Sequence, residues 1–436
     1  MIPRLDIQFP FCRQWQYWFG NPYEPHEGEY LLNHARSGIV LALRASLPNG
    51  GRAGVVTYNC HTVANAVVNT GCTPVFIDVT DELKINVEAL PADLDAIVVT
   101  NLFGIRNDIS AIRAKCPKAI IIVDNAHGYG LPAEGDFTVY SINQGKFPAL
   151  GPGGILVVNL KENKNTENTV ENNKDNNDYL TKKEESEPIG ISSNNLNPKS
   201  AQKQVFGQPS AQSCSVSLTD SFVKNDSLHE SQKNAKKFIE AIEEQYAALP
   251  GYGFFAQVKL FCSMLIKAMA YSRCFYWLTR LLKRELGVSG LGVKGKVVMK
   301  KMAPGIRRLY NAWLPSADEA IAAQKQNAEA ICNLQSAIFN LQSSIFNLQS
   351  SIFNLQSSIS NLKYLIGDNA FMLIARCENP EELKTWFADR GVETATHFAH
   401  AIDWATEFGY LPSSCPKAEK LTKHLLMIPT YVGLGD

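Results

Sequence analysis

The stretch from Ala119 to Asn159 constrains the fold of this chain most, because it holds three short apolar runs that border polar residues. The first run, Ile120 to Val123, is β-branched and stops at Asp124, which is typical of a strand buried on both faces of a sheet. The second run, Phe137 to Ile142, is followed closely by Lys146. Ligands in open α/β sheets gather at the carboxyl edge of the strands. The pattern therefore predicts a site at this edge that contains Asp124 and Lys146.

The residue types at this edge are the ones that pyridoxal phosphate requires. This cofactor needs an amine for a Schiff base, an acid that keeps its ring nitrogen protonated, and hydroxyl or amide donors for its phosphate. Lys146 can supply the amine and Asp124 the acid, while Ser141 offers a hydroxyl on the same rim. We further expect His127 to pack near the ring or its phenolic oxygen.

Three blocks carry a resemblance to a known family. VDNAHGYG, GDFTVYSINQGK and GPGGILVVN resemble the aspartate, lysine and glycine-turn blocks of the DegT/DnrJ/EryC1/StrS sugar aminotransferases. The resemblance implies a fold-type-I α/β architecture, with a mostly parallel central sheet, covering helices and a smaller α+β C-terminal domain. It also implies pyridoxal phosphate as cofactor and a homodimer whose active sites lie between the subunits.

The resemblance also suggests a phosphate site at a helix start. Residues 31–47 have helical periodicity behind Arg36-Ser37-Gly38, and in the family the corresponding hydroxyl and backbone N–H groups take the phosphate. A helix N-terminus suits an anion because its N–H groups are unpaired and its dipole is favourable. Ser37 and Gly38 are therefore predicted cofactor contacts. The alternative is that Ser37 is a plain N-cap.

A second block places a residue against the cofactor ring. Residues 59–67, NCHTVANAV, resemble the family's TFxATANAV block, whose aromatic side chain stacks on the pyridine ring. This sequence has Cys60 and His61 where an aromatic is usual. Because an imidazole can still stack, His61 is the predicted contact, although a lone histidine is more often structural. Which of Cys60 and His61 faces the cofactor is left open.

Composition narrows the class of partner. The chain has 436 residues with equal numbers of basic and acidic side chains, which argues against nucleic acid as a partner. Its ten cysteines lack short regular spacings, so we expect reduced thiols in a cytoplasmic protein and no bound metal. The first nineteen residues lack a continuous apolar core, so no signal peptide is expected.

Two inserts interrupt the domain pattern. The segment Lys161 to Ser231 is rich in Asn, Ser, Lys and Glu, and it is too polar to offset its ordering entropy. Residues 333–362 repeat NLQSSIF with a seven-residue period, which predicts an extended helix with Ile and Leu columns. The predicted organisation is a large cofactor-binding domain (1–160), a disordered insert (161–231), a helical connection (232–332), the heptad insert (333–362) and a small domain (363–436).

The connection and the small domain offer further candidates. Residues 253–282 are strongly apolar but interrupted by charges, so we predict an amphipathic helix pair packed on the small domain, with membrane-surface contact as the alternative. His397 and His400 are candidates for the substrate side of the site. Gly305-Ile306-Arg307 stands where the family often has Asn-x-Arg, which reaches the phosphate in the neighbouring subunit.

Two classes of function remain open on this reading. The first is an aminotransferase that acts on a nucleotide-linked keto sugar for cell-surface polysaccharide or amino-sugar biosynthesis, with glutamate as the amino donor that the family implies. The second is a non-catalytic scaffold on a degenerate transferase fold. The presence of both Lys146 and Asp124 favours the enzyme, and a lysine rather than a histidine at position 146 argues against the family's dehydratase branch.

Overall fold

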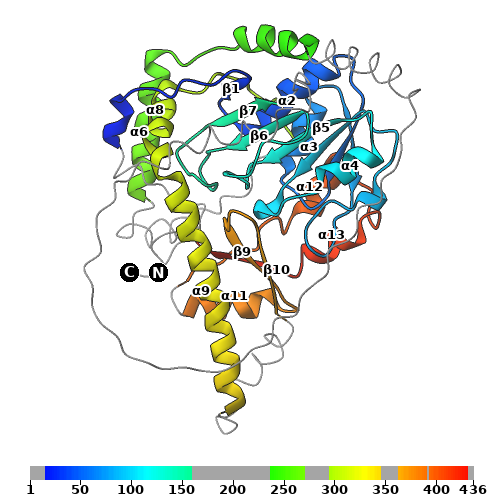
Figure 1. Ribbon diagram of the computed structural model, residues 1–436, viewed down its shortest axis with the longest axis vertical. Helices are drawn as coiled ribbons and strands as arrows, with labels where there is room; N and C mark the ends of the chain where they lie inside the picture. The colour runs from blue at the N-terminus through cyan, green and yellow to red at the C-terminus, as the bar shows by residue number, and fades with distance from the viewer. Residues whose placement is uncertain (1–14, 160–235, 271–293, 345–361, 390–391, 431–436) are drawn as a thin grey trace, which may run out of the picture. The chain divides into compact units, whose positions relative to one another are not determined.

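The computed structural model describes residues 15–159, 236–270, 294–344, 362–389 and 392–430 (Figure 1). Within them, a seven-stranded sheet has the order β1-β7-β6-β5-β4-β2-β3. Its strands are β1 (Glu29–Leu32), β2 (Arg52–Val56), β3 (Thr73–Ile77), β4 (Ala96–Thr100), β5 (Ile120–Asn125), β6 (Phe137–Ser141) and β7 (Gly154–Val158). Strands β2 to β6 pair in parallel, whereas β7 and β1 are antiparallel at one edge. The predicted mostly parallel sheet is confirmed.

Both faces of this sheet are buried, as the continuous apolar strands predict. In β4, Val98 packs on the side of the first two helices of the sheet domain, while Ile97 and Val99 pack in a second cluster on the opposite face. Successive side chains of a strand point to opposite faces, so both faces need apolar residues. The helices over the first face are α2 (Ala35–Ser46) and α3 (His61–Val68), and α4 (Ile109–Lys115) contributes Ile112 to the second cluster.

The start of the chain differs from the predicted helix over residues 31–47. Residues 29–32 form strand β1, which pairs with β7, and α2 begins only at Ala35. The apolar residues Leu31 and Leu32 thus belong to the sheet edge and not to the first helical turn. This offset of the helix start changes which residues reach the site.

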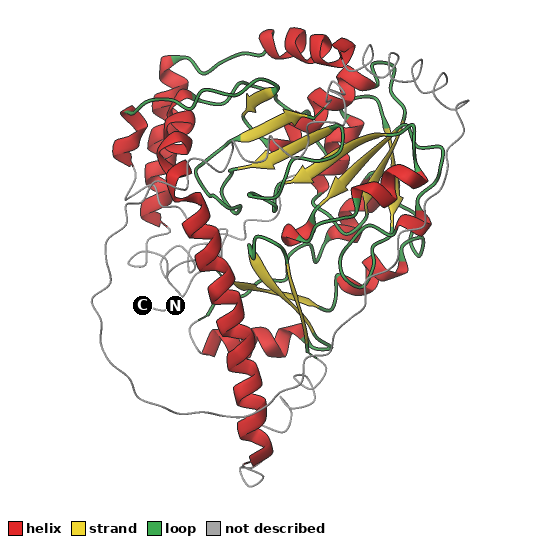
Figure 2. Ribbon diagram, viewed as in Figure 1, coloured by secondary structure: helices red, strands yellow, loops and turns green. Residues whose placement is uncertain are grey.

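A second, three-stranded antiparallel sheet forms from the C-terminal part, in the order β10-β9-β8 (Figure 2). The sheet consists of β8 (Lys363–Ile366), β9 (Met372–Arg376) and β10 (Leu425–Pro429). The same part of the chain contains the helices α11 (Pro380–Asp389), α12 (Ala401–Glu407) and α13 (Pro416–Leu421). Phe371, Ile374 and Met427 join the same apolar cluster as Ile97 and Val99 of the large sheet. This shared core joins the C-terminal part to the carboxyl edge where the site lies.

The helical connection packs differently from the prediction. It contains α6 (Phe254–Ala270), α8 (Pro304–Trp313) and α9 (Ala317–Ser344). Met264 and Ala268 of α6 are buried in a cluster with Trp18 and Ile155, so this helix packs beside the β1–β7 edge of the large sheet and not on the small one. The rest of the predicted helix pair, residues 271–282, lies outside the described residues. No helix of the described residues is both long and apolar enough to cross a membrane.

The two inserts are only partly described. The predicted disordered segment 161–231 lies outside the described residues. Of the heptad segment 333–362, residues 333–344 continue helix α9, which agrees with the predicted helix over that part, and the stretch 345–361 lies outside the described residues. The five-part division of the chain stays a prediction.

Candidate active site

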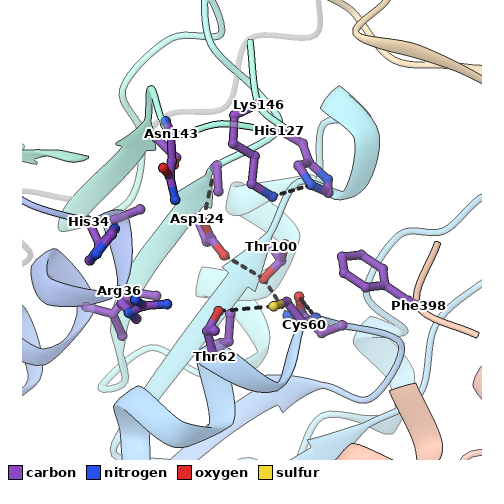
Figure 3. Close-up of a pocket in the computed structure, with 16 residues that line it drawn as sticks. His34, Arg36, Cys60, Thr62, Thr100, Asp124, His127, Asn143, Lys146 and Phe398 are labelled. Atoms are coloured by element: carbon purple, nitrogen blue, oxygen red, sulfur yellow. Dashed lines mark hydrogen bonds between the residues drawn. The ribbon is translucent and has the colours of Figure 1, made fainter. Parts of the chain in front are cut away.

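A cavity of about 170 Å³ opens at the carboxyl ends of β4, β5 and β6, facing the N-termini of α2 and α3 (Figure 3). Parallel pairing brings the strand ends together, because Thr100 of β4 lies opposite Asp124 of β5 in register. The residues that line the cavity lie between positions 34 and 146, except Phe398: His34, Ala35, Arg36, Ile39, Asn59, Cys60, Thr62, Val63, Thr100, Asp124, Ala126, His127, Ser141, Asn143, Lys146 and Phe398.

Asp124 is the buried acid of the cavity, with 3% of its surface exposed. Its carboxylate accepts hydrogen bonds from the Ala126 N–H at 3.0 Å and from the Thr100 hydroxyl at 3.3 Å. The Thr100 hydroxyl in turn accepts from the Asn59 amide at 2.8 Å. Burial raises the pKa of Asp124 above its usual value. A positively charged ring nitrogen next to Asp124 would therefore stabilise the ionised form of its carboxyl group.

Lys146 and His127 lie side by side in the lining of the same cavity and are hydrogen-bonded, with 2.6 Å between Nζ and Nε2 (Figure 3). Burial lowers the pKa of Lys146, while the negative charges of Cys60 and Asp124 act in the opposite direction. Burial also holds the pKa of His127 well below its usual value. A desolvated amine is more often deprotonated and is a better nucleophile.

Aromatic rings surround His127. Phe103, Phe371 and Phe398 each stack on the imidazole, with ring centroids 5.3, 5.2 and 5.9 Å away. The backbone N–H of Phe103 donates to Nδ1 of His127 at 3.2 Å. The imidazole of His127 is therefore held by three phenyl rings. Its Nδ1 atom accepts from the backbone of Phe103, and its Nε2 atom faces Lys146.

The N-terminus of α2 reaches the cavity through other residues than predicted. Ala35 and Arg36 line it, but Ser37 and Gly38 do not. The Ser37 hydroxyl is fully buried and donates to the Asn33 side chain at 2.9 Å, so it is neither a cavity group nor an N-cap. At Gly38, an added Cβ would lie 2.8 Å from Val139, which shows that this glycine allows helix and sheet to approach. A helix turns about 100° per residue, so a small shift of the helix start exchanges buried and site-facing positions.

His34 and Arg36 make this end of the cavity suitable for an anion. Both lie on the side of the cavity away from Phe398 in Figure 3. The Nδ1 atom of His34 is buried and has no hydrogen-bond partner among the described residues. Burial, aided by Arg36, lowers the pKa of His34 to about 4, so the ring is neutral near pH 7. An unpaired polar atom, a guanidinium and a helix N-terminus at one place fit a phosphate.

The predicted contact of His61 with the cofactor ring is also corrected, because the neighbouring residue lines the cavity in its place. His61 lies outside the cavity and packs edge-on against Trp404, with ring centroids 5.1 Å apart. Cys60 lines the cavity instead, and its sulfur accepts a hydrogen bond from the Thr62 hydroxyl at 3.1 Å. The sequence pattern had left these two residues open, and the N-cap position of Cys60 at α3 decides between them.

Of the other residues named from the sequence, some lie at the cavity and others lie elsewhere in the fold. Ser141 lines the cavity, and His397 lies near His127, with ring centroids 5.8 Å apart. His400 is exposed and contacts Asp403 at 3.1 Å, away from the cavity lining. Arg307, in α8, donates to the Tyr23 carbonyl and to Glu24, so it ties down the N-terminal segment.

Asn143, which directly follows the apolar run that contains Ser141, lines the cavity as its position after a strand predicts, whereas sequence reasoning did not single out His34, Thr100 or Phe398. Phe398 is the least expected, because it comes from the C-terminal part of the chain and has a left-handed backbone with φ 56°. A non-glycine residue in that region is uncommon and is often found at functional sites. Only tertiary packing brings it beside His127.

The part of the sequence that forms most of the cavity matches a known protein family. Residues 31–196 match the profile of the DegT/DnrJ/EryC1/StrS aminotransferase family. This part of the chain is similar to that family. The match includes every predicted cofactor contact, and it confirms the family and the class of enzyme, an aminotransferase, that the three sequence blocks indicated. No curated protein matches the chain.

Solved structures show that the aminotransferase fold extends beyond the matched residues. The sugar aminotransferase CalS13 from Micromonospora echinospora is 12% identical, with a TM-score of 0.55 over 99% of this chain and 95% of that chain. The PLP form of the putative sugar aminotransferase Spr1654 from Streptococcus pneumoniae is 13% identical, with a TM-score of 0.53 over 100% and 93%. DesI, crystallised in the presence of its TDP-sugar product, is 13% identical, with a TM-score of 0.50 over 92% and 75%. The predicted fold class is thus confirmed.

Proposed function

We propose that this protein is a pyridoxal-phosphate-dependent aminotransferase that acts on a nucleotide-linked keto sugar, with glutamate as amino donor. The observation that carries the proposal is the placement of a buried acid, Asp124, and the partly desolvated amine of Lys146 on one cavity whose far end carries Arg36. The names of DesI, with its TDP-sugar product, and of Spr1654, in its PLP form, support the substrate class and the cofactor.

Each part of the cavity has a task in this reaction. When bound, pyridoxal phosphate supplies an electron sink for the carbon that loses a proton. Asp124 would keep the ring nitrogen protonated through its negative charge. Arg36, with the N–H groups at the start of α2, would hold the phosphate. Asn143 and Ser141 line the cavity and offer an amide and a hydroxyl.

Lys146 would hold the cofactor through its amine, and the same amine, once freed by an amino donor, would serve as the base that moves the proton of the substrate carbon. His127 Nε2, at 2.6 Å from the amine, fixes where that amine lies. Phe398 and the other rings around His127 exclude water from this side.

The test is a visible absorption spectrum of the purified protein before and after borohydride reduction, followed by peptide mass spectrometry. We expect the reduced cofactor on the peptide that contains Lys146. Lys146→Ala should lose both the label and the half-reaction with glutamate, because Lys146 is the one lysine of the described residues that lines the cavity. The exposed Lys118→Ala variant is the matched control and should behave like the wild type. A label on a different lysine, or none at all, would refute the assignment.

The substrate half of the proposal needs its own measurement. The amino form of the enzyme, made with glutamate, is mixed with nucleotide-linked keto sugars that differ in nucleotide and in the position of the keto group. Return of the original spectrum identifies an accepted sugar. If glutamate and other amino acids leave the spectrum unchanged, a non-catalytic scaffold becomes the better reading. The cytoplasmic location and the homodimer remain predictions.

A further inference from the structure

The proton arrangement between Lys146 and His127 is dictated by a third group, the backbone of Phe103. The Phe103 N–H donates to Nδ1 of His127 at 3.2 Å, so Nδ1 carries a lone pair. A neutral imidazole with a bare Nδ1 carries its proton on Nε2. Because Nε2 lies 2.6 Å from Lys146 Nζ, the amine must accept this proton in a hydrogen bond. An ammonium group has no lone pair with which to do so.

The alternative protonation states conflict with the same contacts. A charged imidazolium would point a second N–H group at the Phe103 N–H. The opposite neutral tautomer, with the proton on Nδ1, makes the same conflict. His127 is 4% exposed and is enclosed by Phe103, Phe371 and Phe398, so water cannot solvate a charge on it. The neutral ring with Nε2–H is the form that satisfies every contact.

We propose that His127 is a positioning residue that holds Lys146 as a free amine in the cofactor-free protein. The amine of Lys146 would then already be deprotonated when a cofactor aldehyde enters the cavity. The inference rests on the proposed function for its biological meaning, but the hydrogen-bond geometry that it uses does not depend on the cofactor.

Several charged or titratable groups surround this pair. Asp124 on β5 and Cys60 at the start of α3 face Lys146 and favour its charged form, whereas burial favours the neutral one. His397 lies beside His127, and Arg36 and His34 line the far side of the cavity. If Asp124 or Cys60 controlled the charge of Lys146, its amine would titrate as that of an ordinary lysine does. Control by His127 and control by these two residues therefore predict different pH profiles for Lys146.

The experiment measures the reactivity of each lysine in the full-length protein freed of cofactor. Acetic anhydride labels amines only in their free form, and peptide mass spectrometry reports the rate for each site. From about pH 6 to about pH 9, we expect the rate at Lys146 to stay flat. The free fraction of an unperturbed amine rises about tenfold per pH unit over the same range, and the peptide that contains exposed Lys118 serves as the reference.

Variants separate His127 from its neighbours. His127→Asn keeps an acceptor near the Phe103 N–H but removes the donor that faces Lys146, so the rate at Lys146 should become pH-dependent like that of Lys118. Phe398→Leu removes a stacking ring without removing a hydrogen bond and should leave the profile flat. Cys60→Ser tests the thiol and should also leave it flat. If a variant fails to fold, ¹⁵N shifts of the imidazoles in the wild type still report whether Nδ1 of His127 is bare.

Two results would overturn the inference. One is a wild-type rate at Lys146 that rises with pH as the rate at Lys118 does. The other is a flat profile in folded His127→Asn, which would show that burial alone keeps the amine neutral. A protein that binds no pyridoxal phosphate would refute the proposed function, yet the labelling profile would still decide the role of His127.

Discussion

Replacing Arg36 is the sharpest test of how the cavity recognises an anion. Arg36 lines the cavity at the N-terminus of α2, next to the buried and unpaired Nδ1 of His34. Burial lowers its pKa but leaves a guanidinium charged near pH 7. A hydrogen bond to a charged group contributes about 1.5–3 kcal/mol. Arg36→Ala should therefore weaken pyridoxal phosphate binding by about ten- to a hundredfold, since about 1.4 kcal/mol corresponds to a factor of ten.

The assay compares two ligands and two arginines. Cofactor-free protein is titrated with pyridoxal phosphate and with pyridoxal, which lacks the phosphate, and the change in absorption gives each Kd. Arg36→Ala should weaken only the phosphate-bearing ligand. Arg44, exposed on the same helix, is the control, and Arg44→Ala should change neither Kd. Equal loss for both ligands would mean that Arg36 shapes the cavity without binding phosphate, and no loss would remove it from the site.

Two further predictions concern the buried acid and the inserts. Because burial raises the folded-state pKa of Asp124 above its unfolded value, the cofactor-free protein should lose stability as pH rises from about 4 through that raised value. Asp124→Asn should thus raise the Tm of the cofactor-free protein at pH 7 while turnover falls about a hundredfold or more; an unchanged Tm together with unchanged turnover would remove Asp124 from the site. Replacing residues 161–231, or separately 333–361, with short linkers should leave a folded dimer that binds pyridoxal phosphate, as size-exclusion chromatography and an absorption spectrum would show. A monomer without cofactor from either variant would place that insert in the functional architecture; the risk is greater for 333–361, since Ile331 and Cys332 just before it pack on the small sheet.

The central strands and two of the cavity residues, Asp124 and Lys146, were predictable from sequence for a local reason. Ile120 to Val123 and Phe137 to Ile142 are short apolar runs, and runs of this kind are stable only when both faces are covered. Once two such strands are parallel neighbours, the residues after them share an edge. Asp124 and Lys146 follow from that rule, and the structure brings both to one cavity.

The helix start shows what a local pattern leaves undetermined. The periodicity of residues 31–47 indicated a helix, but pairing of Glu29–Leu32 with β7 took its first residues into the sheet. Which side chains then face the site depends on where α2 begins against the sheet, and the close approach of Gly38 to Val139 sets that position. Ser37 became a buried structural hydroxyl, and Arg36 took the place at the cavity.

Strand periodicity and parallel pairing are local rules, and they sufficed to predict the central strands, their carboxyl edge and the pair of Asp124 and Lys146. That Cys60 and not His61 faces the cavity, and that Phe398 encloses His127, depends on long-range packing. It also decided the hydrogen bond from Phe103 that sets the proton on His127. These contacts join segments far apart in the chain, and their geometry comes from how the cores of the two sheets pack together.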